Sequence, residues 1–253
     1  MRLADKVAIV TGGGTGIGAA IATTFAREGA RVTITGRRKE ILDEIADSIT
    51  AAGGRALAVP GSVTEEADVQ RAVQATLATF GRVDVLVNNA GSLLHAGPLH
   101  ETADEIWDDV MDVFLKSVFR FSRAVIPHMQ RQGAGSIVNI ASALGLKASL
   151  AFPVHPYAAA KAGVVMLTKT IAVHYAKDGI RCNCVAPAVT ETPLLESRLT
   201  DPAVRKAMEA RVPLGRLGRP DEIAQAVLHL ASDDAAWTTS GAILTVDGGI
   251  MAQ

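Results

Sequence analysis

The chain has 253 residues, of which 49% are hydrophobic and 20% are charged, and its formal net charge is −1. This length and apolar content predict one globular domain, residues 1–253, with a sizeable core. Lysine and arginine are spread along the chain, and no signal-peptide core or long apolar run is present, so we expect a cytoplasmic protein without nucleic-acid or membrane partners.

The first predicted strand, residues 6–10, is a short apolar run of the kind that is buried on both faces of a parallel sheet. It leads into the glycine-rich segment 11–18 (TGGGTGIG), and an amphipathic helical pattern follows at once. Glycines in this context let the backbone approach a pyrophosphate, whose charge meets the N–H groups of the helix N-terminus. The sequence therefore predicts a dinucleotide site, with a glycine turn that binds nothing as the alternative. The candidate contacts are Gly12, Gly14, Thr15, Gly16, Ile17 and Gly18.

A second predicted strand, residues 31–35, is followed by Gly36, Arg37 and Arg38. An acidic residue near this position accepts the ribose 2′-hydroxyl of NAD, whereas an arginine meets the 2′-phosphate of NADP. Because no carboxylate stands there, we expect NADP(H) as the preferred cofactor, with NAD(H) possible. The alternative is that both arginines are solvated residues at the start of a helix over residues 38–52.

Strands and helices continue to alternate along the chain. The further predicted strands are residues 55–59, 83–87, 136–140, 180–185 and 242–246, and the further predicted helices are residues 65–80, 103–132, 157–176 and 221–231. This alternation predicts an α/β fold with a doubly wound, Rossmann-type parallel sheet and helices on both faces. The least regular stretches, residues 91–102, 143–156 and 187–219, each follow a strand. We expect them to gather at the carboxyl edge of the sheet as substrate loops.

Cys182 and Cys184 alternate within one predicted strand, so their side chains should point to the same face. They are too close in sequence for an ordinary disulfide, and no further cysteine or nearby histidine completes a metal site. We expect reduced thiols in the core and no bound metal.

Tyr157 and Lys161 are four positions apart in an alanine-rich run that favours a helix, so both side chains should share one face. A lysine close to a tyrosine is expected to lower the pKa of the phenol from its ordinary value of ~10, which makes it usable as a proton donor or acceptor. Ser142, shortly after the strand of residues 136–140, can supply a second hydrogen-bond donor to a carbonyl oxygen. The alternatives are a solvated tyrosine–lysine pair and an ordinary serine at a strand end.

The chain resembles the short-chain dehydrogenase/reductase family, in its compact branch, over essentially its whole length. The motifs that carry the resemblance are the glycine loop, residues 88–91 (NNAG), Ser142, the Tyr157/Lys161 pair, residues 180–183 (IRCN) leading to Pro187, Thr192 with Pro193, and residues 246–249 (VDGG). The resemblance implies an NAD(P)-dependent oxidoreductase that interconverts a secondary alcohol and a ketone by hydride transfer, assembled as a homotetramer.

The resemblance also implies roles for individual residues. Tyr157 would be the catalytic acid/base, Lys161 would tune it and bond the nicotinamide ribose, and Ser142 would orient the substrate oxygen. Asn89 would fix the central strand beside the cofactor, and Thr192 would contact the nicotinamide or diphosphate end. The further cofactor contacts that it implies are Ser62, Val63, Ala90, Gly91, Pro187 and Val189.

Three positions depart from the family pattern. Phe114 replaces an active-site asparagine that is thought to hold a water behind the lysine, Ser62 replaces an aspartate near the adenine, and Ala188 replaces a glycine after Pro187. Because Phe114 cannot hold that water, a second hypothesis stays open. In it, the chain is a cofactor-binding protein of the same fold with little turnover, acting as a sensor or assembly partner.

The three loops indicate a largely apolar, uncharged small-molecule alcohol or ketone as substrate, because no cluster of arginine or lysine is present in them. Their apolar residues are Leu93, Leu94, Leu144, Leu146, Leu150, Phe152, Val154, Leu194 and Leu195. The main polar groups are His95 and His155, which fit surface positions equally well.

Overall fold

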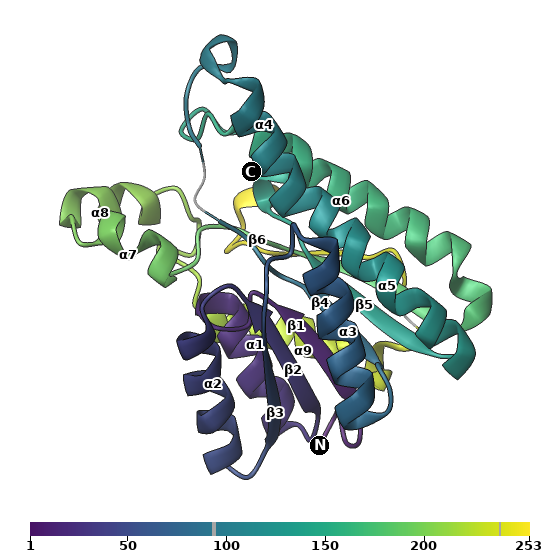
Figure 1. The fold of residues 1–253 in the computed structure, drawn as a ribbon. Coiled ribbons are helices and arrows are strands. Elements are labelled where there is room, and N and C mark those ends of the chain that lie inside the picture. The colour runs from purple at the N-terminus through teal and green to yellow at the C-terminus, as the bar shows by residue number, and fades with distance from the viewer. Residues whose placement is uncertain (93–94, 238) are drawn as a thin grey trace.

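The computed structural model describes residues 1–92, 95–237 and 239–253, with the side chains of all of these except residues 197 and 198. Its centre is a seven-stranded parallel sheet in the order β3-β2-β1-β4-β5-β6-β7 (Figure 1). The strands are β1 (Val7–Thr11), β2 (Arg31–Gly36), β3 (Arg55–Pro60), β4 (Val85–Asn88), β5 (Gly135–Ile140), β6 (Ile180–Pro187) and β7 (Ile243–Val246). The predicted doubly wound α/β domain is confirmed, and the strands lie close to their predicted positions.

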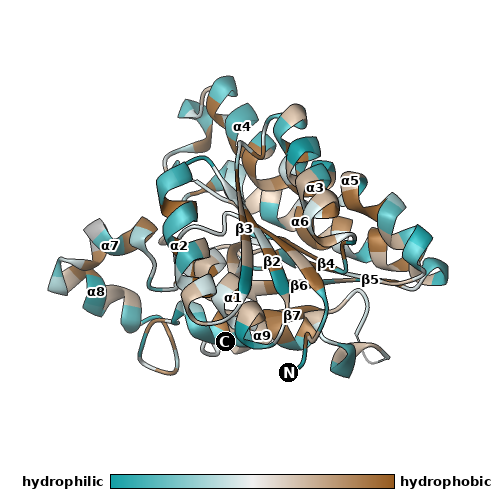
Figure 2. Ribbon diagram, turned by 60° about the horizontal axis from the view of Figure 1, so that its bottom comes forward, coloured by the Kyte–Doolittle hydropathy of each residue, from teal (hydrophilic) through white to brown (hydrophobic). Residues whose placement is uncertain are grey.

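Helices cover both faces of the sheet. On one face lie α1 (Gly16–Arg27), α2 (Lys39–Ala51) and α9 (Pro220–Ala231). On the other lie α3 (Glu66–Phe80), α5 (Ser117–Gln132) and α6 (His155–His174). Figure 2 shows hydrophobic residues along the strands and hydrophilic residues on the outward sides of the helices.

Two apolar cores result, because successive strand residues point to opposite faces. Val10 of β1 packs in the core that contains Phe25 of α1, whereas Ile9, one residue earlier, packs in the core that contains Phe121 of α5. Both phenylalanines are almost fully buried, and burying a side chain of this size contributes about 1.5–3 kcal/mol to folding. The sheet is therefore fixed from both sides.

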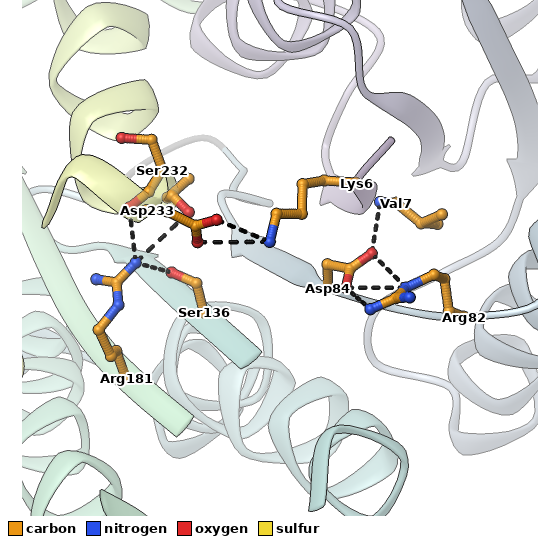
Figure 3. A network of polar contacts seen from close by, with 9 residues as sticks. Lys6, Val7, Arg82, Asp84, Ser136, Arg181, Ser232 and Asp233 are labelled. Atoms are coloured by element: carbon orange, nitrogen blue, oxygen red, sulfur yellow. Dashed lines mark hydrogen bonds and ion pairs between the residues drawn. The ribbon is translucent and has the colours of Figure 1, made fainter. Parts of the chain in front are cut away.

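Polar contacts hold the amino ends of the strands together (Figure 3). The buried carboxylate of Asp84 accepts a hydrogen bond of 2.9 Å from the Val7 N–H and pairs with Arg82 at 2.6 Å, which ties β4 to β1. Arg181 of β6 donates to the hydroxyl of Ser136 on β5 at 3.3 Å and to the Ser232 carbonyl at 3.1 Å. These contacts all lie at the edge opposite the loops, which leaves the carboxyl edge free for a site.

Two helical predictions need correction. The predicted helix of residues 103–132 consists of α4 (Asp104–Met111), a π-helical turn η2 (Asp112–Lys116) and α5. The apolar pattern continues through the turn, so periodicity alone does not reveal it. Residues 187–219, predicted as irregular, contain α7 (Pro193–Leu199) and α8 (Pro202–Glu209). Each begins with a proline in its first turn, which is a helix-start signal that the sequence did carry.

The remaining helical pieces are short 3₁₀ turns: η1 (Leu99–Glu101), η3 (Ala143–Gly145), η4 (Ala176–Asp178), η5 (Asp233–Ala235) and η6 (Ile250–Ala252). Cys182 and Cys184 are buried and free, and both pack on the side of the sheet that α5 and α6 cover. In the part of the chain that the structure describes, no helix combines the length and the apolar character needed to cross a membrane.

Candidate active site

A cavity of about 1920 Å³ opens at the carboxyl ends of the strands. It spans the point where the strand order reverses, between β1 and β4, which is where ligands bind in open parallel sheets. Residues from all three irregular stretches line it. The predicted catalytic and cofactor-contacting residues are all described, and Gly18 is the one among them that does not line the cavity.

The glycine loop forms one wall, and its packing explains why glycines are needed. Gly12 has a positive φ of 65°, and a Cβ added there would lie 2.9 Å from the Ala90 Cα. A Cβ on Gly18 would lie 2.1 Å from the Gly12 oxygen, so Gly18 supports the loop from behind. Helix α1 begins at Gly16, and its first N–H groups have no partner within the helix. This cradle fits a diphosphate.

Asn89 ties β4 to β1 beside this loop. Its side-chain amide donates to the carbonyl oxygens of Thr11 at 3.0 Å and Gly12 at 3.3 Å. The Thr11 hydroxyl in turn accepts hydrogen bonds from the N–H groups of Asn89 and Ala90, at 2.9 and 3.0 Å. The position that the resemblance implied for Asn89, fixing the central strand, agrees with this geometry.

Arg37 and Arg38 lie at the end of β2, where both side chains are exposed and line the cavity. Within the described part of the chain, neither side chain has an ion pair or a hydrogen bond. Ser62 and Val63 line the same region after β3, and the Gly61 N–H donates to the Gly36 oxygen at 2.8 Å. Two free guanidinium groups therefore stand where a ribose 2′-substituent of a dinucleotide would lie.

Ser142 and Tyr157 meet at the floor of the cavity. The Ser142 oxygen accepts the Leu144 N–H at 3.1 Å, and the Tyr157 phenol lies beside the Ser142 hydroxyl. Burial raises the pKa of the Tyr157 phenol above its ordinary value, and the neighbouring Ser142 hydroxyl lowers it by a smaller amount. The phenol pKa is thus raised and not lowered as predicted, because burial is the largest influence and Lys161 is not among the causes of the shift.

Lys161 lies one helical turn after Tyr157 and is only 5% exposed. Its ammonium group donates to the carbonyl oxygen of Ile140, at the end of β5, at 2.6 Å. Burial lowers the pKa of this lysine to about 8. The hydrogen bond to the Ile140 carbonyl helps to keep the ammonium group charged near neutral pH despite its burial. No pattern in the sequence indicates this contact.

Phe114, in the π-helical turn, closes the site behind these two residues. Its ring meets the Tyr157 ring edge to face, with centroids 4.9 Å apart and planes at 86°. The Lys161 Nζ lies 5.1 Å from the centre of the Phe114 ring and 5.7 Å from that of Tyr157. Phe114 is buried together with Val110 and Ala160, so an apolar wall stands there.

Known proteins with related sequences and structures match nearly the whole chain. Residues 12–251 match the family model described as enoyl-(acyl carrier protein) reductase. A 2-(R)-hydroxypropyl-CoM dehydrogenase of Xanthobacter autotrophicus is 45% identical over 252 residues, which cover 98% of this chain and 99% of that protein. A cis-4-hydroxycyclohexanecarboxylate dehydrogenase of Sinomonas cyclohexanicum is 45% identical over 249 residues, 98% of each chain.

The crystal structure of gox2181 superposes with a TM-score of 0.95 at 37% identity, covering 100% of this chain and 98% of that one. The chain belongs to the short-chain dehydrogenase/reductase family. As a member of this family, it is an NAD(P)-dependent oxidoreductase that acts on CH–OH groups.

We call the part of the cavity beside the glycine loop and the end of β2 its cofactor half. The other walls of this short-chain dehydrogenase/reductase cavity come from the loops of residues 91–102, 143–156 and 187–219. Of the loop residues predicted from the sequence, those that line it are His95, Leu144, Leu150, Phe152, Val154, Leu194 and Leu195. Leu146 and His155 do not line the cavity, and Leu93 and Leu94 lie outside the described residues. Sequence reasoning missed two cations on these walls, Lys147 and Arg211, because each is isolated in the sequence and reaches the cavity only through the fold. In the described residues, no group of histidine, cysteine and carboxylate side chains could hold a metal ion.

Proposed function

We propose that this protein is an NADP(H)-preferring oxidoreductase that interconverts a secondary alcohol and a ketone, with Ser142, Tyr157 and Lys161 as its catalytic set. The observation that carries the proposal is that Ser142, Tyr157 and Lys161 gather at one point of the cavity, with the Lys161 Nζ 5.7 Å from the centre of the Tyr157 ring. All three line the same cavity as the glycine loop. Acid/base groups and a dinucleotide cradle thus share one space.

The chemistry needs these groups for a physical reason. A ketone that accepts a hydride gains negative charge on its oxygen, so the site must supply a proton and a second hydrogen-bond donor. Tyr157 would give the proton and Ser142 would hold the oxygen. The phenol holds its proton at neutral pH, and the raised pKa makes it a weaker acid than a phenol in water. A bound nicotinamide would supply or accept the hydride.

The residues present fit a dinucleotide phosphate. The glycine loop and the N-terminus of α1 would hold the diphosphate, and Arg37 and Arg38 would meet a 2′-phosphate. Ser62, where the family usually has an aspartate, would lie near the adenine, and its N–H donates to the Asp68 carboxylate at 2.7 Å. The remaining contacts would come from residues that line the same cavity: Ile17, Val63, Asn89, Ala90, Gly91, Lys161, Pro187, Val189 and Thr192.

The substrate would be a small alcohol or ketone with an apolar body, held by the loops of residues 91–102, 143–156 and 187–219. The apolar residues of these loops that line the cavity support this choice. The relative named for cis-4-hydroxycyclohexanecarboxylate shows that one closely similar chain takes a hydroxyl on an apolar ring. We also propose a homotetramer as the assembled form.

The test follows absorbance at the reduced-nicotinamide band with a panel of secondary alcohols and ketones, with each cofactor. We expect cofactor-dependent turnover of at least one alcohol–ketone pair. Cofactor binding without turnover across the whole panel would favour the second hypothesis, a cofactor-binding protein, which Phe114 suggested.

A further inference from the structure

The outer part of the cavity has an apolar wall. Met208, Val212 and Leu217 are buried together, and Phe152 and Val204 pack against them. Of these, Phe152, Val204, Met208 and Val212 line the cavity. The segment that carries α7 and α8 stands out from the carboxyl edge of the sheet on this side (Figure 1). The wall would contact the body of a substrate whose reacting carbon lies at Tyr157.

Arg211 introduces a cation into this wall. It follows α8, lines the cavity and is exposed, and its guanidinium carbon lies 5.6 Å from the centre of the Phe152 ring. Phe152 belongs to the loop that leads to Tyr157, five residues later. A guanidinium held over an aromatic ring keeps its edge N–H groups available for a carboxylate.

The neighbouring arginines differ from Arg211 in one respect. Arg216 and Arg219 both pair with Glu222, at 2.6 and 3.4 Å, and Arg205 pairs with Glu191. Within residues 199–219, whose side chains are all described, Arg211 is the one arginine without a carboxylate at ion-pair distance. The fold therefore leaves this guanidinium without an anion of its own.

The other groups on the cavity wall do not take this place. The carboxylate of Asp201 accepts the Ala203 N–H at 2.8 Å as the cap of α8, and Asp109 lies on α4. Lys147 donates to the main-chain oxygen of Gln253 at 3.0 Å, and Lys161 is bound at the catalytic floor. Arg37 and Arg38 lie at the end of β2, in the cofactor half.

We propose that Arg211 binds a carboxylate at the end of the substrate that is remote from the reacting carbon. The preferred substrates are then secondary hydroxycarboxylates with an apolar middle, and the matching oxocarboxylates. This inference rests on the proposed function, because it assigns the substrate of the same site. It corrects the expectation of an uncharged substrate, which considered only clusters of charged residues in the loops.

The experiment compares secondary hydroxycarboxylates of graded chain length with their methyl esters, which have the same body without the charge. We expect the parent protein to show a lower KM for the acid than for the ester at the matching length. Arg211→Gln should raise KM for the acid about tenfold, the effect of losing one charge-assisted contact at a partly open site, with little change in kcat or in either value for the ester. Arg211→Lys should restore part of the KM difference between acid and ester, since it keeps the positive charge but loses the planar pair of N–H donors of the guanidinium.

Arg216→Gln is the matched control, because Arg216 is a neighbouring arginine that does not line the cavity, and it should leave both KM values unchanged. Melting temperatures establish that each variant is folded. Two results would overturn the role of Arg211 and leave the proposed function standing. One is an equal KM for acids and esters in the parent protein, and the other is an Arg211→Gln variant whose KM for the acid stays within twofold of the parent's. Absence of turnover with every compound and both cofactors would overturn both.

Discussion

Lys161 combines a functional position with an unfavourable environment. It is almost fully buried and its pKa is lowered from 10.5 to about 8 by that burial. A difference of this size corresponds to a cost on the order of 3 kcal/mol for keeping the buried group charged near neutral pH. The Ile140 carbonyl, at 2.6 Å, offsets part of this cost.

The cost predicts a pH-dependent gain in stability for Lys161→Met. Below pH 8 the folded parent carries the charge at a cost, and above about pH 10.5 the lysine is neutral in both the folded and the unfolded state. We expect Lys161→Met to be inactive but more stable at pH 7, with a gain that shrinks as the pH rises from 8 to 10. Urea unfolding at both ends of this range measures the difference in the free energy of unfolding between parent and variant.

Lys169→Met, an exposed position on the same helix, is the control. A gain that is equal at both pH values would show that burial of the charge is not its cause.

Phe114 raises a separate question, how Tyr157 regains its proton. The family asparagine is thought to hold a water behind the lysine, whereas here Phe114 packs with the apolar side chains of Val110 and Ala160. Ser117 lies three residues after Phe114 on the same helical stretch, but it already donates its hydroxyl to the Val113 oxygen at 2.5 Å. We therefore expect the proton to return to Tyr157 from the cavity side, where Ser142 also lies.

Phe114→Asn should accordingly increase turnover and make it less dependent on buffer concentration. It should also destabilise the fold by about 3 kcal/mol, since it removes a buried aromatic ring. The measurement is turnover against pH and buffer concentration for parent and variant, with unfolding followed in parallel. If the folded variant is no faster and added buffer does not accelerate the parent, proton return does not limit this protein.

At the scale of elements, we propose that the carboxyl end of β2 sets the preference between the two cofactors. Arg37 stands there without a partner in the described residues, and a charge-assisted phosphate contact contributes roughly 1.5–3 kcal/mol. We expect Arg37→Ala to weaken NADPH binding at least tenfold and to leave NADH binding unchanged. Fluorescence titration of both cofactors measures this, with Arg27→Ala, at the end of α1 and outside the cavity, as the control. Equal affinities of the parent protein for NADPH and NADH would contradict the proposed role of Arg37.

The sequence predicted elements well where a local pattern decides them. The apolar run of β1, the glycine loop after it and the Tyr157/Lys161 spacing all depend on neighbours along the chain, and each was placed correctly. The π-helical turn at Phe114 and the phenol pKa depend on packing between distant segments. The same holds for Arg211, which reaches Phe152 only because the fold brings α8 beside the loop of residues 143–156.

At the scale of the whole molecule, the amino and carboxyl edges of the sheet have different roles. The amino edge is closed by the Asp84 and Arg181 contacts, which connect strands that are far apart in the sequence. The carboxyl edge carries the cavity and the loops. Rigid ties at one edge allow variable loops at the other without loss of the strand order on which the glycine loop and Asn89 depend.

The outer faces of α5 and α6 favour assembly. Phe119, Met166 and Val173 are 45%, 59% and 75% exposed, which leaves apolar surface on helices that already pack together beside the sheet. We expect a symmetric homotetramer in sedimentation at micromolar concentration. Met166→Glu together with Val173→Glu should shift the protein to smaller species, because two charges per copy would be desolvated at the interface. A monomeric parent would contradict this.

The proposed reaction depends most on Tyr157 as the group that exchanges a proton with the substrate oxygen. The direct measurement is turnover and cofactor affinity in Tyr157→Phe, which removes only the phenol oxygen and keeps the ring that packs on Phe114. We predict that turnover falls at least a thousandfold while cofactor affinity stays within a few-fold of the parent, since only the proton-transfer step loses its partner. A folded Tyr157→Phe protein that retains a tenth or more of the parent's turnover would contradict the account.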